Sequence, residues 1–236
     1  MADRKENELT KANNFEYVRA LDSNGNSIQI SKSDLVSVLE ELLQSYKSVV
    51  YVAYYGSNNN LLCTPWENWN TGRSGAVGVV IIEGSKRLLV AVDEVMLYWS
   101  SKTGSGGATT TTDKGTADED YEGQSNTSEI VSSSSFSSDG SGYAPGYCHA
   151  YSKGNKAAGT WWLPSLGELG MIWKYFEPIN AALARISGAT QLSRAGYWSS
   201  TEYSASNAWI LYMSDGIRWY NSKTTNQGRV RPVSAF

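Results

Sequence analysis

Residues 196–236 read GYWSSTEYSASNAWILYMSDGIRWYNSKTTNQGRVRPVSAF and carry most of the information about the architecture of this chain. Within them, residues 208–213 alternate between two faces and are followed by Ser214-Asp215-Gly216, a strong turn sequence. An alternating run that ends in such a turn predicts the two strands of a β-hairpin. The side chains should then divide by face, with Trp209, Leu211 and Met213 on one side and Ile210, Tyr212 and Ser214 on the other.

The hairpin sequence is also dense in Tyr, Trp, Ser, Asn and Thr. Aromatic rings contribute contact area at low entropic cost because they have few rotatable bonds, and small polar residues adapt their hydrogen bonds to a ligand. This composition favours a binding surface. A strand edge that packs within its own domain has the same composition, and it stays open as the alternative.

The length and composition of the chain are typical of a globular protein. With 236 residues, of which 41% are hydrophobic and 18% charged, it should hold one large domain and a small appendage. A net charge of -3 without a basic cluster gives no reason to expect nucleic acid. Membrane insertion is not expected, because no apolar run approaches about 20 residues. The polar residues 1–6 lack a secretory signal pattern, which predicts folding in the cytoplasm.

Residues 1–48 are predicted to form an attachment or oligomerisation segment. Alternating runs at 15–21 and 27–30 flank a turn and predict a pair of strands. A helix should follow over about 32–44. Its apolar stripe comprises Leu35, Val38, Leu39, Leu42 and Tyr46. Because so small an element cannot bury this stripe alone, it should fold back on the main domain or pair with copies of itself.

Residues 49–236 should form the main domain. The part at 49–69 has no clear pattern and is predicted to be a connector. Apolar runs at 76–82 and 87–92 predict a buried hairpin, where the core should begin. The segment 100–142 consists mostly of Ser, Thr, Gly and Asp, so we expect a long low-complexity insertion on the surface that contributes nothing to the core.

Two helices should pack against the sheet. Ser165 and Glu168 form a capping-box pattern, which predicts a helix over about 166–176. Pro178 suits the first turn of a second helix that Gly188 ends. Apolar positions at helical spacing support both helices: Leu166, Leu169, Ile172, Trp173 and Phe176 in the first, and Ile179, Ala182, Leu183 and Ile186 in the second. Two helices against a mostly antiparallel, twisted sheet make an α+β fold.

Residues with catalytic or metal-binding potential are few. His149 is the only histidine and follows Cys148, and adjacent side chains rarely form a nucleophile–base pair. The acidic residues at 118–122 lack the spacing of an EF-hand loop. We therefore expect no enzymatic activity, no cofactor and no metal site. Cys63 and Cys148 are too few for a disulfide scaffold and should be buried thiols, with a single bridge between them as the alternative.

The order of several motifs resembles that of C-type-lectin-like domains. The motifs are WWLPSLGEL at 161–169, YWSSTE at 197–202, Ala208-Trp209, Gly216 and RVRPV at 229–233. That family includes the variable proteins of diversity-generating retroelements, among them phage tail receptor-binding proteins such as the major tropism determinant. The resemblance covers roughly residues 76–236 and implies a C-type-lectin-like α+β fold.

In such proteins a reverse transcriptase rewrites adenine-containing codons near the C-terminus, so that variation gathers on one ligand-facing surface. The positions predicted to form this ligand-facing surface are Tyr203, Ser204, Ser206, Asn207, Ile210, Tyr212, Ser214, Asp215, Ile217, Trp219, Tyr220, Asn221, Ser222, Thr224, Thr225 and Asn226. All except Trp219 are reachable from an asparagine codon by changing only its adenines. Beneath them, Trp198, Trp209, Arg229 and Val233 should be an unchanging framework.

The resemblance implies a phage tail receptor-binding protein that attaches the virion to its bacterial host. Its partners would be a host-cell surface protein or glycan, phage tail proteins through the N-terminal segment, and copies of itself in a homotrimer, with a monomer as the alternative. It would be made in the bacterial cytoplasm and reside in the virion; the alternative location is the bacterial cell surface. A lectin-like adhesin without diversification and a structural virion protein stay open as other functions.

Overall fold

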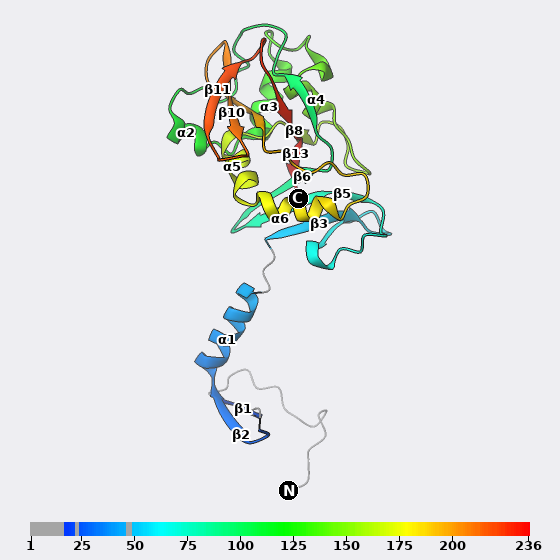
Figure 1. Cartoon of the computed structure of the whole chain (residues 1–236), viewed down its shortest axis with the longest axis vertical. Coiled ribbons are helices and arrows are strands. Elements are labelled where there is room, and N and C mark those ends of the chain that lie inside the picture. Colours follow the sequence, from blue (N-terminus) through cyan, green and yellow to red (C-terminus); the bar gives the residue numbers. More distant parts are fainter. Residues whose placement is uncertain (1–16, 22–23, 46–48) are drawn as a thin grey trace. The chain divides into compact units, whose positions relative to one another are not determined.

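The computed structural model describes residues 17–21, 24–45 and 49–236 (Figure 1). Contacts within the chain divide it into two units, residues 1–48 and residues 49–236. Helices occur together with mostly antiparallel strands, so the protein has the predicted α+β fold.

The N-terminal unit consists of a strand pair and a helix, as the sequence predicts. Strands β1 (Tyr17–Leu21) and β2 (Ser27–Ser31) pair antiparallel, and α1 (Lys32–Ser45) follows without a loop. Ser31 caps the helix, because its hydroxyl accepts a hydrogen bond from the Asp34 N–H at 3.1 Å. The same hydroxyl donates to the Asp34 carboxylate at 2.6 Å.

The apolar stripe predicted for α1 is described only in part. Leu35 is half-buried and Val38 is exposed. Tyr46 and the side chains of Leu39 and Leu42 lie outside the described residues.

The main domain contains a six-stranded sheet with the order β4-β3-β5-β6-β13-β8. Its strands are β3 (Val50–Tyr55), β4 (Leu61–Pro65), β5 (Ala76–Glu83), β6 (Lys86–Ala91), β8 (Trp161–Trp162) and β13 (Val233–Ala235). All pairings are antiparallel, and the C-terminal strand β13 lies between β6 and β8. The predicted hairpin of β5 and β6 is confirmed.

The prediction of a connector at residues 49–69 is wrong, because this part supplies β3, β4 and a short 3-10 helix, η2 (Trp66–Asn68). Val52 on β3 packs in one hydrophobic cluster and Ala53 in another, so both faces of the strand are covered. A strand that is apolar on both faces lacks the polar alternation by which strands are recognised in sequences.

A second, five-stranded sheet has the order β11-β10-β9-β12-β7. Its strands are β7 (Val95–Tyr98), β9 (Gly196–Glu202), β10 (Asn207–Tyr212), β11 (Arg218–Ser222) and β12 (Gln227–Val230). All neighbours are antiparallel except β12 and β9.

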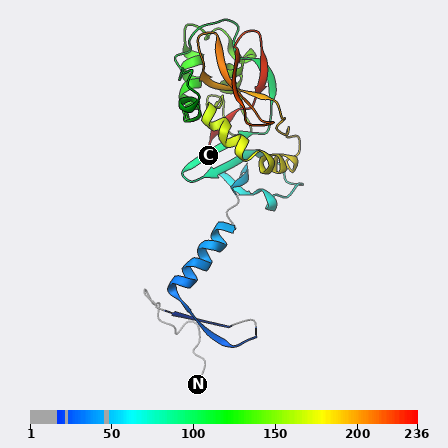
Figure 2. The same cartoon turned by 60° about the vertical axis from the view of Figure 1, so that its left-hand side comes forward.

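Helices α5 (Leu166–Lys174) and α6 (Phe176–Ala184) connect the two sheets. Helix α5 contacts β9 and β10, whereas α6 contacts β3 and β5. Figure 2 shows these yellow helices between the orange strands of one sheet and the cyan strands of the other. The Glu168 carboxylate accepts a hydrogen bond from the N–H of Ser165 at 2.8 Å, which confirms the predicted helix start.

The expectation that residues 100–142 stay outside the core is wrong. The segment forms α2 (Lys114–Asp118), α3 (Gly123–Ser132) and a short 3-10 helix, η3 (Gly140–Gly142), and leads into α4 (Ala144–Ala150). Ile130 and Phe136 are buried in a cluster with Trp99 and Trp198. Although the segment has few large apolar side chains, those it has are placed to cover one face of the five-stranded sheet.

The predicted framework residues are mostly buried. Trp198, Trp209 and Val233 lie in the core. Arg229 departs from the prediction, since its side chain is 38% exposed. The neighbouring Arg231 is the buried arginine, and it forms an ion pair with Glu94 at 2.9 Å.

The cysteines are free thiols, but only Cys148 is fully buried, and burial raises the pKa of its thiol well above the usual value. Cys63 is half-buried, which corrects the expectation of two buried thiols. Among the helices that the structure describes, none combines the length and the apolar character needed to cross a membrane.

Candidate ligand-binding surface

The hairpin of β10 and β11 forms one edge of the five-stranded sheet, with β11 outermost (Figure 1). Trp209 is opposite Tyr220 and Ile210 is opposite Trp219 across the two strands. Because directly opposite residues share a face, Trp209 and Tyr220 point to one side of the sheet and Ile210 to the other. At the outer edge, the ring of Trp219 lies against the ring of Tyr220. The predicted hairpin and its assignment of faces are confirmed, since Trp209 packs in one core cluster and Ile210 in another.

A run of four aromatic rings leads from the core to the surface at this edge. Buried Trp209 meets Tyr203 edge-on, with ring centroids 5.2 Å apart. Tyr203 stacks on Tyr220 at 3.9 Å, and Tyr220 stacks on Trp219 at 5.3 Å. The Trp209 indole N–H donates to the carbonyl of Thr111 at 2.9 Å, which fixes the inner end. The outer ring, Trp219, is 54% exposed.

Nearly all of the positions predicted to face a ligand are accessible. Those exposed are Ser206, Ser214, Asp215, Ile217, Trp219, Thr225 and Asn226, and those half-buried are Tyr203, Ser204, Asn207, Tyr212, Tyr220, Asn221, Ser222 and Thr224. Ile210 is the exception, because it is only 2% exposed and packs in the core cluster that contains Trp198. Its side chain cannot contact a ligand in this structure, and the prediction for Ile210 is wrong.

The accessible positions fall into two groups at the two ends of the hairpin. At one end, the turn between β9 and β10 and the turn after β11 lie together, because the Lys223 N–H donates to the Ser206 carbonyl at 3.0 Å. At the other end, the Gly216 N–H donates to the Tyr212 carbonyl at 2.8 Å and closes the β10–β11 turn. Strand β11, with Trp219 and Tyr220, links the two ends.

A buried ion pair holds the first end in place. Lys223 and Glu202 are in direct contact, and the side chains of both are fully buried. The ammonium of Lys223 also donates to the Gly104 carbonyl at 2.9 Å, and the Glu202 carboxylate accepts from the Gly106 N–H at 2.8 Å. Burial lowers the pKa of Lys223, and the ion pair with Glu202 opposes that shift. The sequence does not predict this pair, because its only signal there is a single lysine within a run of Ser, Thr and Asn.

The second end rests on helix α5. Gly216 has a φ of +75° and lies against the Trp173 ring, where a Cβ atom would come within 2.4 Å of the indole. Glycine is therefore required at this turn both by conformation and by space. Trp173 itself is 37% exposed, so its prediction as a core residue is wrong. Arg218 adds support through an ion pair with Asp118 at 2.7 Å.

The acidic residues at 118–122 serve the structure in several ways. Asp118 pairs with Arg218, and Asp120 accepts hydrogen bonds from the Thr201 hydroxyl at 2.6 Å and the Asn126 amide at 2.9 Å. Within the described part of the chain, no group of three or more His, Cys, Asp or Glu side chains is arranged to hold a metal ion. These contacts join the segment 100–142 to β9 and β11.

Comparison with known proteins gives a fold relationship and nothing more specific. No family model and no curated protein matches the chain. Among solved structures, a fimbrial protein from Bacteroides ovatus ATCC 8483 is similar, with a TM-score of 0.60 and 17% sequence identity. The similarity covers 79% of this chain and 48% of the fimbrial protein, so the chain spans about half of that protein's length. At this identity the relationship shows a shared fold.

Proposed function

We propose that this chain is an attachment protein that binds a ligand on a bacterial surface through the edge of the β10–β11 hairpin, as phage tail receptor-binding proteins do. The observation that carries the proposal is the aromatic run that ends at exposed Trp219. Binding hot spots are enriched in Trp and Tyr, and aromatic rings held on a rigid support lose little entropy when they bind.

The turns next to the four aromatic rings can change in sequence, and such changes would alter which ligand is bound. The accessible turns carry small polar side chains, whereas their backbones are fixed by the buried Lys223–Glu202 pair and by the packing of Gly216 on Trp173. Side chains can therefore change without loss of the fold beneath them. This is the arrangement that a diversified C-type-lectin-like surface requires, and the ligand would be a protein or a glycan.

A bacterial adhesin is the second candidate, and the similarity to a fimbrial protein favours it. Both candidates use the same surface but differ in where the protein resides. Immunogold labelling of the source bacterium and of its phage particles would separate them, because the first predicts gold on tail tips and the second predicts gold on the cell surface.

Adsorption to cells tests the proposal itself. The full chain, labelled with a fluorophore, should bind saturably to one or a few strains in a panel of bacteria. Protease treatment of the cells should abolish binding if the ligand is a protein, and periodate treatment should abolish it if the ligand is a glycan. Labelling of neither particles nor cells, together with no saturable adsorption, would count against an attachment function.

The N-terminal unit is proposed to join the binding domain to its carrier or to other copies. Val36 on α1 and Leu21 on β1 are exposed apolar side chains, and so small a unit gains stability when such side chains are covered. Light scattering should give the mass of a homotrimer for the full chain and the mass of a monomer for residues 49–236. A monomer in both cases would contradict this assignment.

A further inference from the structure

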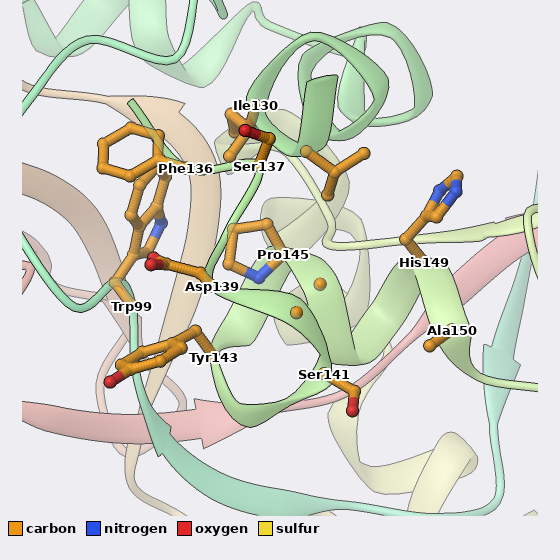
Figure 3. Close-up of a pocket in the computed structure, with 13 residues that line it drawn as sticks. Trp99, Ile130, Phe136, Ser137, Asp139, Ser141, Tyr143, Pro145, His149 and Ala150 are labelled. Carbon is orange, nitrogen blue, oxygen red and sulfur yellow. The ribbon is translucent and has the colours of Figure 1, made fainter. Parts of the chain in front are cut away.

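A cavity of about 180 Å³ lies among η3, α3 and α4 (Figure 3). In the view of Figure 3, Trp99, Phe136 and Tyr143 stand on one side of Pro145, and His149 and Ala150 stand on the other. Most of the side chains that line the cavity are apolar or aromatic.

Two polar side chains in the lining, Trp99 and Asp139, already have partners within the protein. The Trp99 indole N–H donates to the Ser199 carbonyl at 2.9 Å. The Asp139 carboxylate accepts from the Ser101 hydroxyl at 2.5 Å and from the Ser101 N–H at 3.0 Å. An occupant therefore does not have to satisfy a buried charge, and a charged occupant would lose its hydration without gaining a partner.

Close packing among the lining residues fixes the cavity walls. Gly146 on α4 lies against η3, where a Cβ atom would come within 1.9 Å of the Gly140 carbonyl oxygen. Trp99 and Phe136 pack edge to face, with centroids 5.3 Å apart and planes at 81°. Helix α4 thus cannot move closer to η3, and the cavity is formed in the absence of an occupant.

We propose that this cavity binds a small, uncharged aromatic compound, with a ring of about the size of phenol or indole. An apolar cavity of about 150 Å³ in another protein accepts benzene, so the volume here suits a single ring or a small fused pair. Aromatic rings and Pro145 in the walls favour an aromatic occupant, because edge-to-face contacts add to the burial of apolar area. A hydroxyl or N–H on the ring would lie toward exposed Ser141 and half-buried His149.

Titration of the full chain with indole, followed by ¹H–¹⁵N NMR, tests the proposal. We expect saturable shifts that include the Trp99 indole N–H and the backbone amides of residues 130–150. Benzoate, which has a similar ring and a negative charge, should bind at least tenfold more weakly. Shifts that do not saturate, or that are scattered over the whole domain, would overturn the proposal.

Two variants at the rim of the cavity test where indole binds. Ala150→Trp and Ser141→Trp replace exposed lining residues and should each weaken indole binding at least tenfold. Ala158→Trp places the same ring at an exposed position outside the lining and should leave the affinity within twofold. Equal affinities in all three variants would place the indole site elsewhere and refute the assignment. If either Ala150→Trp or Ser141→Trp fails to fold, the other variant shows whether indole binds in this cavity.

Discussion

Residues 100–142 and residues 203–226 are both rich in small polar side chains, but the second region also carries many large ones, and the large side chains of the two regions lie in different places. In the first region Ile130 and Phe136 are buried, and the small residues around them form helices and turns. In the second region the large apolar side chains of β10 are buried, whereas Ile217 and Trp219, in and beside β11, are exposed. The polar composition is thus compatible with a core layer and with a candidate binding surface, and the positions of the large side chains distinguish the two.

The largest effect is expected from the framework beneath both regions. Trp198 is fully buried, and its indole N–H donates to the Leu97 carbonyl at 3.0 Å. Trp198→Ala should cost about 3 to 5 kcal/mol of unfolding free energy, because it removes a large buried ring and leaves a cavity. Chemical denaturation measures the loss, and an unchanged midpoint would contradict the assignment of Trp198 to the core.

The buried ion pair tests how the second region is anchored. Lys223→Met removes the positive partner and leaves the Glu202 carboxylate buried without a counter-charge. We therefore expect the free energy of unfolding to fall by about 3 kcal/mol. The matched control is Thr224→Met, since Thr224 is the next residue and is half-buried. A Lys223→Met protein as stable as the Thr224→Met protein would show that the ion pair does not hold this turn.

Phe136 tests whether residues 100–142 belong to the core. Phe136→Ala should cost roughly 3 kcal/mol, as expected for the loss of a buried aromatic ring. Ser134→Ala, an exposed change two residues away, should stay within about 0.5 kcal/mol. Equal stabilities of the two variants would restore the view of the segment as a surface insertion.

Glu168 gives a pH dependence with a defined sign. Burial raises the pKa of Glu168 to about 7, although hydrogen bonds from Ser165 and Trp162 oppose the shift. The folded state then binds the proton more tightly than the unfolded state, whose pKa is close to 4.5. The contribution of Glu168 to the free energy of unfolding is therefore fully present below pH 4.5 and is lost as the pH rises through about 7.

Replacement of Glu168 by glutamine isolates this dependence. Between pH 4.5 and pH 8, the free energy of unfolding of the wild type should fall by up to about 3 kcal/mol relative to that of Glu168→Gln. Urea denaturation of both proteins across this range measures the difference. A constant difference at all pH values would show that Glu168 does not titrate in this window.

The sequence predicted the elements whose patterns are local. The hairpin of β10 and β11, the start of α5 at Ser165 and the strand pair at the N-terminus all depend on neighbours along the chain. The resemblance to C-type-lectin-like domains supplied the list of positions predicted to face a ligand, and all of them but Ile210 are accessible in the structure.

The elements that were missed depend on contacts between distant residues. Strand β3 is buried on both faces, so its sequence shows no polar alternation. Phe136 is surrounded by serines, and only the approach of Trp99 makes it a core residue. Ile210 and Trp219 are opposite each other in the hairpin, and only their positions in the sheet make one buried and the other exposed.

We propose that the outer edge at β11 binds the ligand, and two double variants at opposite edges of the same sheet test this proposal. Ile217→Ala with Trp219→Ala removes exposed apolar side chains beside β11, and Met96→Ala with Tyr98→Ala removes exposed side chains from β7. Adsorption to a strain that binds the wild-type protein should fall at least tenfold for the first pair and stay unchanged for the second. Both should melt within a few degrees of the wild type, because exposed side chains contribute little to stability. An equal loss of adsorption in both, or an early melt confined to the first pair, would contradict the claim.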